Sequence, residues 1–326
     1  MVRLSREDLE TFHEQGYVVA EGLLDPVADL DPVIDEYHGV LDSLADELYA
    51  KGEISQRYTE LDFNERYLRI CEESGRIHSQ YFDFMLPKRN VKPDSPLWVG
   101  PAIFHMIRNE RLLDAVEQFI GPEIYSNPVQ HVRMKPPEHR TPVNPQTGKI
   151  QVGATPWHQD GGVVNEDADE TEMITVWFPL WDAPVEAGCL EVIPYSHLQG
   201  LRRHCPSPTG GGPSLHEAVI EHREAVALPM RRGDVLFMSR YMKHSSLSNH
   251  SDSMRWSFDL RYNPTGQPTG REVFPGFVAR SRKHPESELR DPRAWAQLWY
   301  DARARMAAPD FVDFSYNRWT SDFPGC

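Results

Sequence analysis

The sequence has no apolar run that approaches the roughly 20 residues of a membrane-spanning helix. Of its 326 residues, 40% are hydrophobic and 25% are charged, a composition typical of globular proteins, so membrane association is not expected. Residues 1–13 also contain no apolar segment of the kind that a secretory signal requires. We therefore expect a cytoplasmic location.

Cysteines are few, and their positions show no regular spacing. The four of them form neither a C-x-x-C pair nor the framework of a disulfide-rich domain, which argues against a zinc site and against disulfide bonds. The residues that we expect to be reduced thiols are Cys71, Cys189, Cys205 and Cys326.

Basic residues are also in deficit, with 34 Lys and Arg against 49 Asp and Glu, which gives a formal net charge of -15. An acidic chain repels a phosphate backbone, so nucleic acid is not an expected partner. The sequence leaves the oligomeric state open.

The first part of the chain, residues 1–123, is expected to be mainly helical, because apolar residues recur there three and four apart between capping residues. Ser5 and Asp8 form a capping pair that predicts a helix over residues 6–15, and a short strand, GYVVAEGLL, should follow over 16–24. Further helices are expected to begin at Pro32 with Asp31 as N-cap, to occupy two pieces between residues 65 and 122, and to begin at Pro292 with Asp291 as N-cap.

Residues 124–265 consist of short β-branched and aromatic runs separated by Pro, Gly and Asn, the pattern of an antiparallel sandwich or barrel. The clearest run, MRWSFDLRY, alternates apolar and ionic residues, so each kind occupies one face of a strand. The ionic face is expected either to be exposed or to line a polar cavity, and it consists of Arg255, Ser257, Asp259 and Arg261.

Two further segments complete a single expected domain, 1–326. Residues 200–217 are rich in Gly and Pro and show no periodicity, which predicts a long irregular loop of the kind that often acts as a lid. Residues 266–326 are expected to form a C-terminal helical extension.

An H-x-D tripeptide is the first indication of chemistry. An iron(II) oxygenase needs two imidazoles and one carboxylate on one side of the metal, because the other side must stay open for co-substrate and dioxygen. On a strand, residues i and i+2 point to the same side, so His158 and Asp160 in WHQDGG could bind one ion. A third ligand must come from a distant strand.

The tripeptide alone is weak evidence, because 14 histidines and 23 aspartates in 326 residues give about one H-x-D by chance. A second one, His250 with Asp252, occurs in NHSD and is better explained as a polar turn. Only His284 follows it, and no later strand offers a third ligand with an arginine behind it.

Order and spacing favour His158 as the first ligand. His244 follows it by 86 residues at the end of a β run, and Arg255 follows His244 by 11. An inward-facing arginine can form a bidentate pair with the distal carboxylate of a dicarboxylic acid, and Ser246 can donate to the same group. The alternative is that Arg255 lies on the surface. The predicted iron ligands, which are also the catalytic residues, are His158, Asp160 and His244.

These residues lie in a chain that resembles the phytanoyl-CoA dioxygenase family of iron(II) and 2-oxoglutarate oxygenases over most of its length. The segments that carry the resemblance are LSREDLETFHEQGYVVAEGLL, VRMKPP with WHQD, ITVWFPLWDAPVEAGCLEVIPYSHLQG and HSSLSNHSDSMRWSFDLRY. Tyr195 stands where the family has the glycine of G-S-H, which puts the turn before Ser196 in doubt.

The resemblance implies a mainly β protein with flanking helices around a double-stranded β-helix, the cupin-like jelly roll. It also implies iron(II) as cofactor and 2-oxoglutarate and dioxygen as co-substrates. The implied reaction is hydroxylation of an unactivated C–H bond of a small-molecule metabolite, with release of succinate and carbon dioxide. Desaturation, ring formation and demethylation are alternative outcomes, because they use the same oxidant. The residues implied to contact 2-oxoglutarate are Arg255, Ser246, Gln159, Trp177 and His131. For Trp177 the alternative is a core tryptophan, and for His131 an ordinary inner residue of a strand.

The carboxylate of Asp160 argues against halogenation, because related halogenases have a small residue there that leaves room for chloride. The main alternative to an oxygenase is a jelly-roll protein that binds a metal or ligand without catalysis, and a zinc hydrolase is a second. A protein that only binds a metal or ligand has no need for an arginine that binds a dicarboxylic acid. A zinc hydrolase would leave Arg255 and Ser246 without a function.

Overall fold

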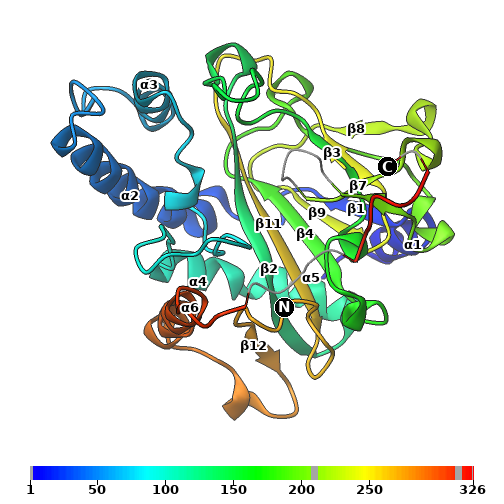
Figure 1. Ribbon diagram of the computed structural model, residues 1–326. Helices are drawn as coiled ribbons and strands as arrows, with labels where there is room; N and C mark the ends of the chain where they lie inside the picture. The colour runs from blue at the N-terminus through cyan, green and yellow to red at the C-terminus, as the bar shows by residue number, and fades with distance from the viewer. Residues whose placement is uncertain (1–2, 207–211, 313–317, 325) are drawn as a thin grey trace.

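The computed structural model describes residues 3–206, 212–312, 318–324 and 326. Two antiparallel sheets form a jelly roll, and most of the helices gather on one side of it (Figure 1). The fold that the resemblance implied, mainly β with flanking helices, is confirmed.

The larger sheet has six strands in the order β1-β9-β4-β11-β2-β12, all antiparallel to their neighbours. Because a barrel strand alternates between an inner and an outer face, its register decides which side chains enter the interior. The bounds are β1 Tyr17–Ala20, β2 Glu123–Lys135, β4 Ile174–Pro179, β9 Val235–Ser239, β11 Arg255–Pro264 and β12 Phe277–Ser281.

The smaller sheet has four strands in the order β3-β10-β5-β8. A separate two-stranded ladder joins β6 to β7. The bounds are β3 Thr155–His158, β5 Leu190–Val192, β6 His204–Cys205, β7 Ser214–Leu215, β8 Val226–Leu228 and β10 His244–Ser246.

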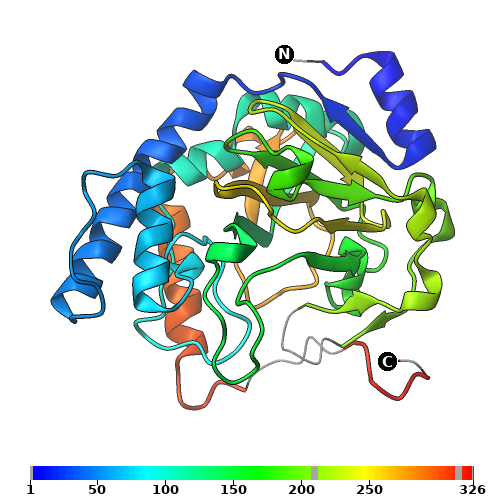
Figure 2. The same cartoon turned by 90° about the horizontal axis from the view of Figure 1, so that it is seen from above.

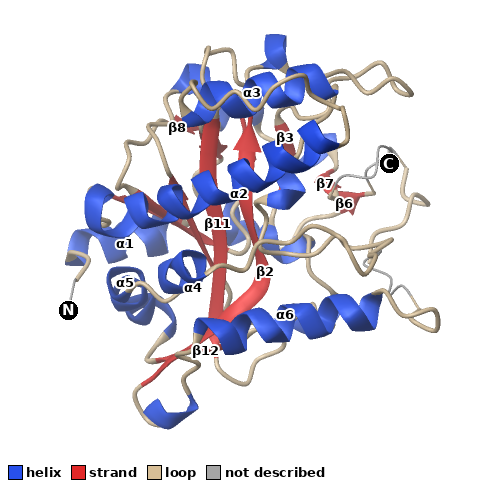
Figure 3. Ribbon diagram, turned by 90° about the vertical axis from the view of Figure 1, so that its left-hand side faces the viewer, coloured by secondary structure: helices blue, strands red, loops and turns tan. Residues whose placement is uncertain are grey.

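Helices cover the outer face of the larger sheet, and Figure 3 shows α2, α4 and α6 in front of β11 and β2. Short 3-10 turns connect many of the elements, and within the described part of the chain no helix is both long and apolar enough to cross a membrane. The bounds are α1 Arg6–Gln15, α2 Asp31–Ala50, α3 Phe63–Ser74, α4 Pro101–Ile107, α5 Glu110–Ile120 and α6 Pro292–Met306.

The two faces of β11 meet different surroundings. On the outer face, Trp256, Phe258 and Leu260 are fully buried in the main hydrophobic core, which they share with the helices. On the inner face, Arg255 and Arg261 are each only 2% exposed. The ionic face therefore lines the barrel interior, and the exposed alternative is wrong.

Several predicted element boundaries differ from the structure. The first strand ends at Ala20 and not at residue 24, and the two helical pieces expected between residues 65 and 122 are three helices, α3, α4 and α5. The capping box of Ser5 and Asp8 is present at α1. Helix α2 begins at Asp31 itself, because a π-helical turn capped by Asp25 runs directly into it. The larger sheet also takes β1 and β12 from outside residues 124–265, so the sheet extends into both flanking parts.

Tyr195 forms the turn that glycine forms in the family. Its φ is 65°, in the left-handed region that glycine favours, and its backbone N–H donates to Gln15 O at 2.9 Å. The turn before Ser196 is therefore built without a glycine.

The segment expected to be an irregular loop, residues 200–217, contains the β6–β7 ladder, and its residues 207–211 lie outside the described ones.

Cys205 in this segment forms a disulfide bond with Cys326, so the expectation of reduced thiols is wrong for this pair. The two cysteines are 121 residues apart, and only folding brings the C-terminal segment beside residues 201–206, as Figure 2 shows. The free cysteines, both buried as expected of reduced thiols, are Cys71 and Cys189.

Candidate active site

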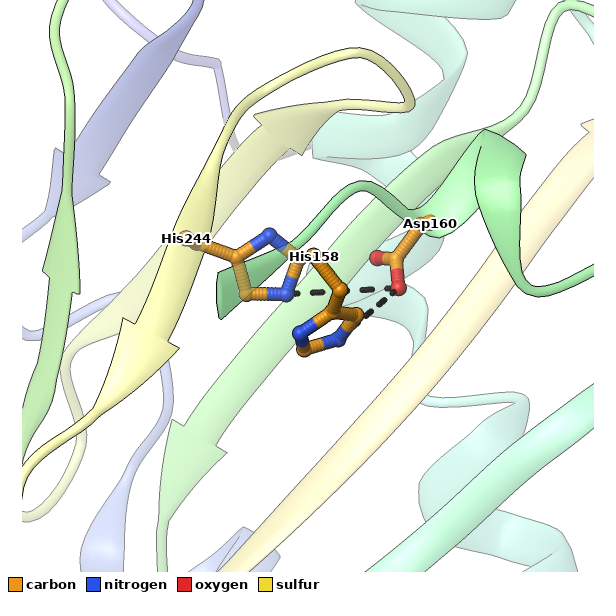
Figure 4. A group of neighbouring side chains, drawn as sticks. All are labelled: His158, Asp160 and His244. Atoms are coloured by element: carbon orange, nitrogen blue, oxygen red, sulfur yellow. Dashed lines mark ion pairs between the residues drawn. The ribbon is translucent and has the colours of Figure 1, made fainter. Parts of the chain in front are cut away.

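Three predicted ligands meet at one end of the barrel interior (Figure 4). His158 ends β3, His244 begins β10 directly opposite it in the ladder, and Asp160 lies in the 3-10 turn after β3. One ligand atom from each lies within 4.8 Å of the others. Asp160 Oδ1 is 3.8 Å from His158 Nε2 and 4.0 Å from His244 Nε2. The group is the only such cluster in the part of the chain that the structure describes.

Hydrogen bonds aim both imidazoles at this point. His158 Nδ1 lies 2.9 Å from Pro156 O, and His244 Nδ1 lies 3.1 Å from Met242 O. Because a carbonyl oxygen only accepts, each Nδ1 carries the proton, and each Nε2 presents a lone pair to the cavity. Burial and the neighbouring His244 lower the pKa of His158 to about 3, so its ring is neutral near pH 7.

Two residues fix the carboxylate of Asp160, and the sequence did not single out either for this role. Burial opposes ionisation of Asp160, but Arg261 and the two histidines outweigh it and hold its pKa well below the ordinary value. Arg261 donates to Oδ1 and Thr175 donates to Oδ2. The carboxylate is therefore charged and oriented, which is the form that binds a metal.

This donor set fits iron(II). Two neutral imidazole nitrogens and one carboxylate oxygen are the ligands of mononuclear non-haem iron oxygenases, in which the remaining positions stay open. The alternative H-x-D pair does not form such a group, since the side chain of His250 is 70% exposed and that of Asp252 is fully exposed. That pair lies in a turn, as the sequence indicated.

A second cluster of buried cations lies next to the metal group. Arg255 pairs in register with Lys135, and Lys135 Nζ donates to Ser246 Oγ at 2.6 Å. Arg255 donates to Ser257 Oγ at 2.5 Å, and its guanidinium lies over the Trp177 ring, 5.6 Å from the centroid. The structure thus brings together three of the predicted 2-oxoglutarate residues and adds Lys135, whose only signal in the sequence was the K-P-P motif.

These cations lack an acidic partner close enough to neutralise them. Burial, with Arg255 next in effect, lowers the pKa of Lys135 to about 6, and burial with Arg133 lowers that of Arg255 to about 10. No described carboxylate forms a salt bridge with either residue. A buried arginine beside a lysine that takes up a proton when an anion binds favours binding of an anion, and the neighbouring hydroxyls can donate to it.

Two further residues that were predicted to contact 2-oxoglutarate, Gln159 and His131, make their hydrogen bonds to other parts of the chain than the cluster of Arg255 and Lys135. The side-chain amide of Gln159 is occupied by the backbone, because it donates to Gly200 O and Tyr241 O and accepts from Arg202 N. It therefore holds loops together and does not point to the cation cluster. His131 does face the interior, beside Asp259 in register, and its Nδ1 lies 2.8 Å from Asp83.

Comparison with known proteins agrees with this geometry. A family model described as phytanoyl-CoA dioxygenase (PhyH) matches residues 12–257. A curated relative, phytanoyl-CoA dioxygenase domain-containing protein 1 of Danio rerio, is 27% identical over 267 residues, which cover 77% of this chain and 87% of the relative. The 1-deoxypentalenic acid 11-beta-hydroxylase of Streptomyces arenae is 32% identical over 127 residues, 36% of this chain and 43% of the relative.

Among solved structures, the apo form of the non-heme monooxygenase ThoJ superposes with a TM-score of 0.59 at 19% identity. The superposition covers 91% of this chain and 95% of that one, so the two share a fold. With a family model matched over most of its length, the chain belongs to the phytanoyl-CoA dioxygenase family and is an iron- and 2-oxoglutarate-dependent oxygenase.

Proposed function

We propose that the chain acts as one oxygenase domain that hydroxylates an unactivated C–H bond of a small-molecule metabolite. The reaction consumes 2-oxoglutarate and dioxygen and releases succinate and carbon dioxide. The observation that carries the proposal is the pairing of a two-histidine, one-carboxylate group with a buried cation cluster inside one barrel. A hydroxylase among the curated relatives supports the reaction type.

In this proposal His158, Asp160 and His244 hold iron(II). When bound, iron(II) supplies the redox centre at which dioxygen is activated and the C–H bond is oxidised. The neutral Nε2 atoms donate lone pairs, and Arg261 and Thr175 keep the carboxylate in place. A carboxylate at position 160 occupies the position that chloride would need, so hydroxylation is proposed and halogenation is not.

Arg255, Lys135 and Ser246 receive the distal carboxylate of 2-oxoglutarate. His244 and Ser246 are two residues apart on β10, so the metal group and the clamp are separated by about 7 Å, near the length of an extended five-carbon dicarboxylate. Trp177 packs against Arg255 and excludes water from the ion pair. His131, held by Asp83, lines the space beside the co-substrate.

The test uses purified full-length protein with iron(II), ascorbate and oxygen. We expect slow conversion of 2-oxoglutarate to succinate without added substrate, and we expect Asp160→Ala to abolish it because the metal loses its carboxylate. Arg255→Ala should raise the dissociation constant of 2-oxoglutarate roughly 10- to 100-fold, since a charge-assisted pair is lost, and should leave iron affinity nearly unchanged.

Anaerobic binding of 2-oxoglutarate to the iron-loaded protein gives the decisive measurement, because chelation produces a charge-transfer absorption band. Absence of that band in the wild type would overturn the oxygenase proposal. Equal loss of iron and 2-oxoglutarate in Arg255→Ala would show that this residue supports the fold and does not anchor the co-substrate.

A further inference from the structure

Asp160 differs from the two histidines in its backbone setting. His158 and His244 lie on paired strands, whereas Asp160 lies in the 3-10 turn Asp160–Gly162 that follows β3. Backbone in a turn is not held by a continuous strand ladder, so the position of its carboxylate depends on what packs against the turn. The contacts of this turn therefore bear directly on the metal group.

The C-terminal segment, defined as residues 318–324 and 326, contacts that turn through Arg318 and Trp319. Trp319 Nε1 donates to Gly162 O at 2.6 Å, and Arg318 donates to Gly161 O at 3.3 Å. Arg318 also forms a bidentate ion pair with Asp169 at the far end of the same loop, and its side chain is only 8% exposed. Both ends of the loop are thus joined to two neighbouring residues of the C-terminal segment.

His204 holds the other side of the same turn. Its Nε2 accepts from the backbone N–H of Gln159 at 3.0 Å, and its ring stacks on Trp319 with centroids 5.2 Å apart. A side chain at Gly162 would place its Cβ 2.2 Å from the His204 ring. The two stacked rings therefore hydrogen-bond to the backbone on both sides of Asp160, His204 to Gln159 and Trp319 to Gly162.

Residues 202–205 hold the C-terminal segment in place. Arg203 donates to Thr320 O at 2.8 Å, and its guanidinium lies 5.1 Å from the Phe323 ring centroid. The disulfide bond between Cys205 and Cys326 then closes the last turn of the chain onto the same strand that carries His204. The C-terminal segment lies beyond residues 12–257, the part that matches the family model.

We propose that the C-terminal segment, residues 318–324 and 326, forms a brace that positions Asp160 for the metal, with Trp319 as the positioning residue and the Cys205–Cys326 bond as the lock. The inference rests on the proposed metal group. The disulfide bond raises the effective concentration of Trp319 at the turn, so the hydrogen bond to Gly162 forms at a lower entropic cost than it would from a free end. Neither Trp319 nor Cys326 touches the cation cluster that would bind 2-oxoglutarate.

The test is a cobalt(II) titration of metal-free, full-length protein, followed by its visible absorption, which reports the ligand geometry. Trp319→Phe keeps the ring stack and removes the N–H donor, and Cys326→Ser removes the lock. Each should weaken cobalt(II) binding about tenfold, the usual loss when a supporting contact of a metal ligand is removed. Ser321→Ala, an exposed residue of the same segment, is the matched control and should bind as the wild type does.

The affinity for 2-oxoglutarate distinguishes a positioning role of Trp319 from a general loss of structure. In metal-loaded Trp319→Phe, the affinity for 2-oxoglutarate should stay within twofold of the wild type, because Arg255 and Lys135 are untouched. Circular dichroism checks that each variant folds. Arg318→Lys, which keeps the charge but loses the bidentate ion pair with Asp169, is a second variant that tests the same contact.

Two outcomes contradict the brace in distinguishable ways. Wild-type cobalt(II) affinity and spectra in Trp319→Phe, Cys326→Ser and Arg318→Lys would overturn the brace and leave the proposed metal group standing. A wild-type protein that binds no divalent metal would overturn the proposed function itself, and the brace with it.

Discussion

At the scale of single residues, Lys135 is a group whose charge depends on whether an anion is bound beside it in the barrel. Its pKa is lowered to about 6, mainly by burial, from an ordinary value of 10.5. Between these values the unfolded chain binds a proton that the folded chain lacks, so this group contributes stability that rises with pH and is lost as pH falls toward 6. A bound dicarboxylate reverses the effect, because it favours the ammonium form.

We therefore expect 2-oxoglutarate binding to take up a proton and to weaken as pH rises above about 6. Isothermal titration calorimetry in two buffers of different ionisation enthalpy measures the uptake. Lys135→Met should abolish it, whereas Lys135→Arg, which stays charged, should bind without uptake. Binding that is independent of pH in the wild type would show that Lys135 is not part of the clamp.

The residues that could be predicted are those whose role follows from order and spacing. The grouping of His158, Asp160 and His244 was predicted in this way, and so was the inward-facing position of Arg255, whose contact with 2-oxoglutarate stays a prediction. Thr175 and Arg261 were not, because their contacts to Asp160 join strands that are distant in sequence. The backbone contacts of the Gln159 amide were not foreseen for the same reason, since its partners lie on two other loops.

At the scale of elements, the junction between the helices and the larger sheet depends on one aromatic cluster. Trp256 on β11 is fully buried, and its ring lies 5.1 to 5.8 Å from those of Tyr37, Phe63, Tyr67 and Phe82. Its Nε1 donates to Asn64 Oδ1 at 3.0 Å at the start of α3. The side chain thus joins α2 and α3 to the outer face of the sheet.

Trp256→Ala should lower the free energy of unfolding by about 3 to 5 kcal/mol, because it leaves a cavity and removes the ring contacts. Urea denaturation followed by circular dichroism measures the change. Leu298→Ala on α6, whose side chain is 39% exposed, should change it by less than about 1 kcal/mol. A small effect of Trp256→Ala would mean that the helices are held to the sheet elsewhere.

Elements with a strong local sequence signal were predicted well. Elements that are defined mainly by their pairing with a distant strand were predicted poorly. Alternation in β11 and the capping box of α1 are local, and both are present. Strand β12 has only five residues and is recognisable by its pairing with β2. The β6–β7 ladder has two residues in each strand and therefore too little periodicity to be seen.

At the scale of the whole molecule, one covalent bond closes the chain on itself. Cys205 and Cys326 are 121 residues apart, and Cys326 is exposed at the surface. The irregular spacing of the cysteines argued for reduced thiols, but spacing does not reveal that the C-terminal segment folds back onto β6. In the chain-entropy view, a closed loop of this length stabilises the folded state by about 4 to 5 kcal/mol.

A thiol count tests the bond directly. In denaturant without reductant, two thiols per chain should react, those of Cys71 and Cys189, and four should react after reduction. Cys326→Ser should expose three thiols before and after reduction, and it should lower the midpoint of thermal unfolding because the unfolded chain regains the entropy of the open loop. Four reactive thiols in unreduced wild-type protein would show that the sequence-based expectation was right, and the stability of Cys326→Ser should then equal that of the wild type.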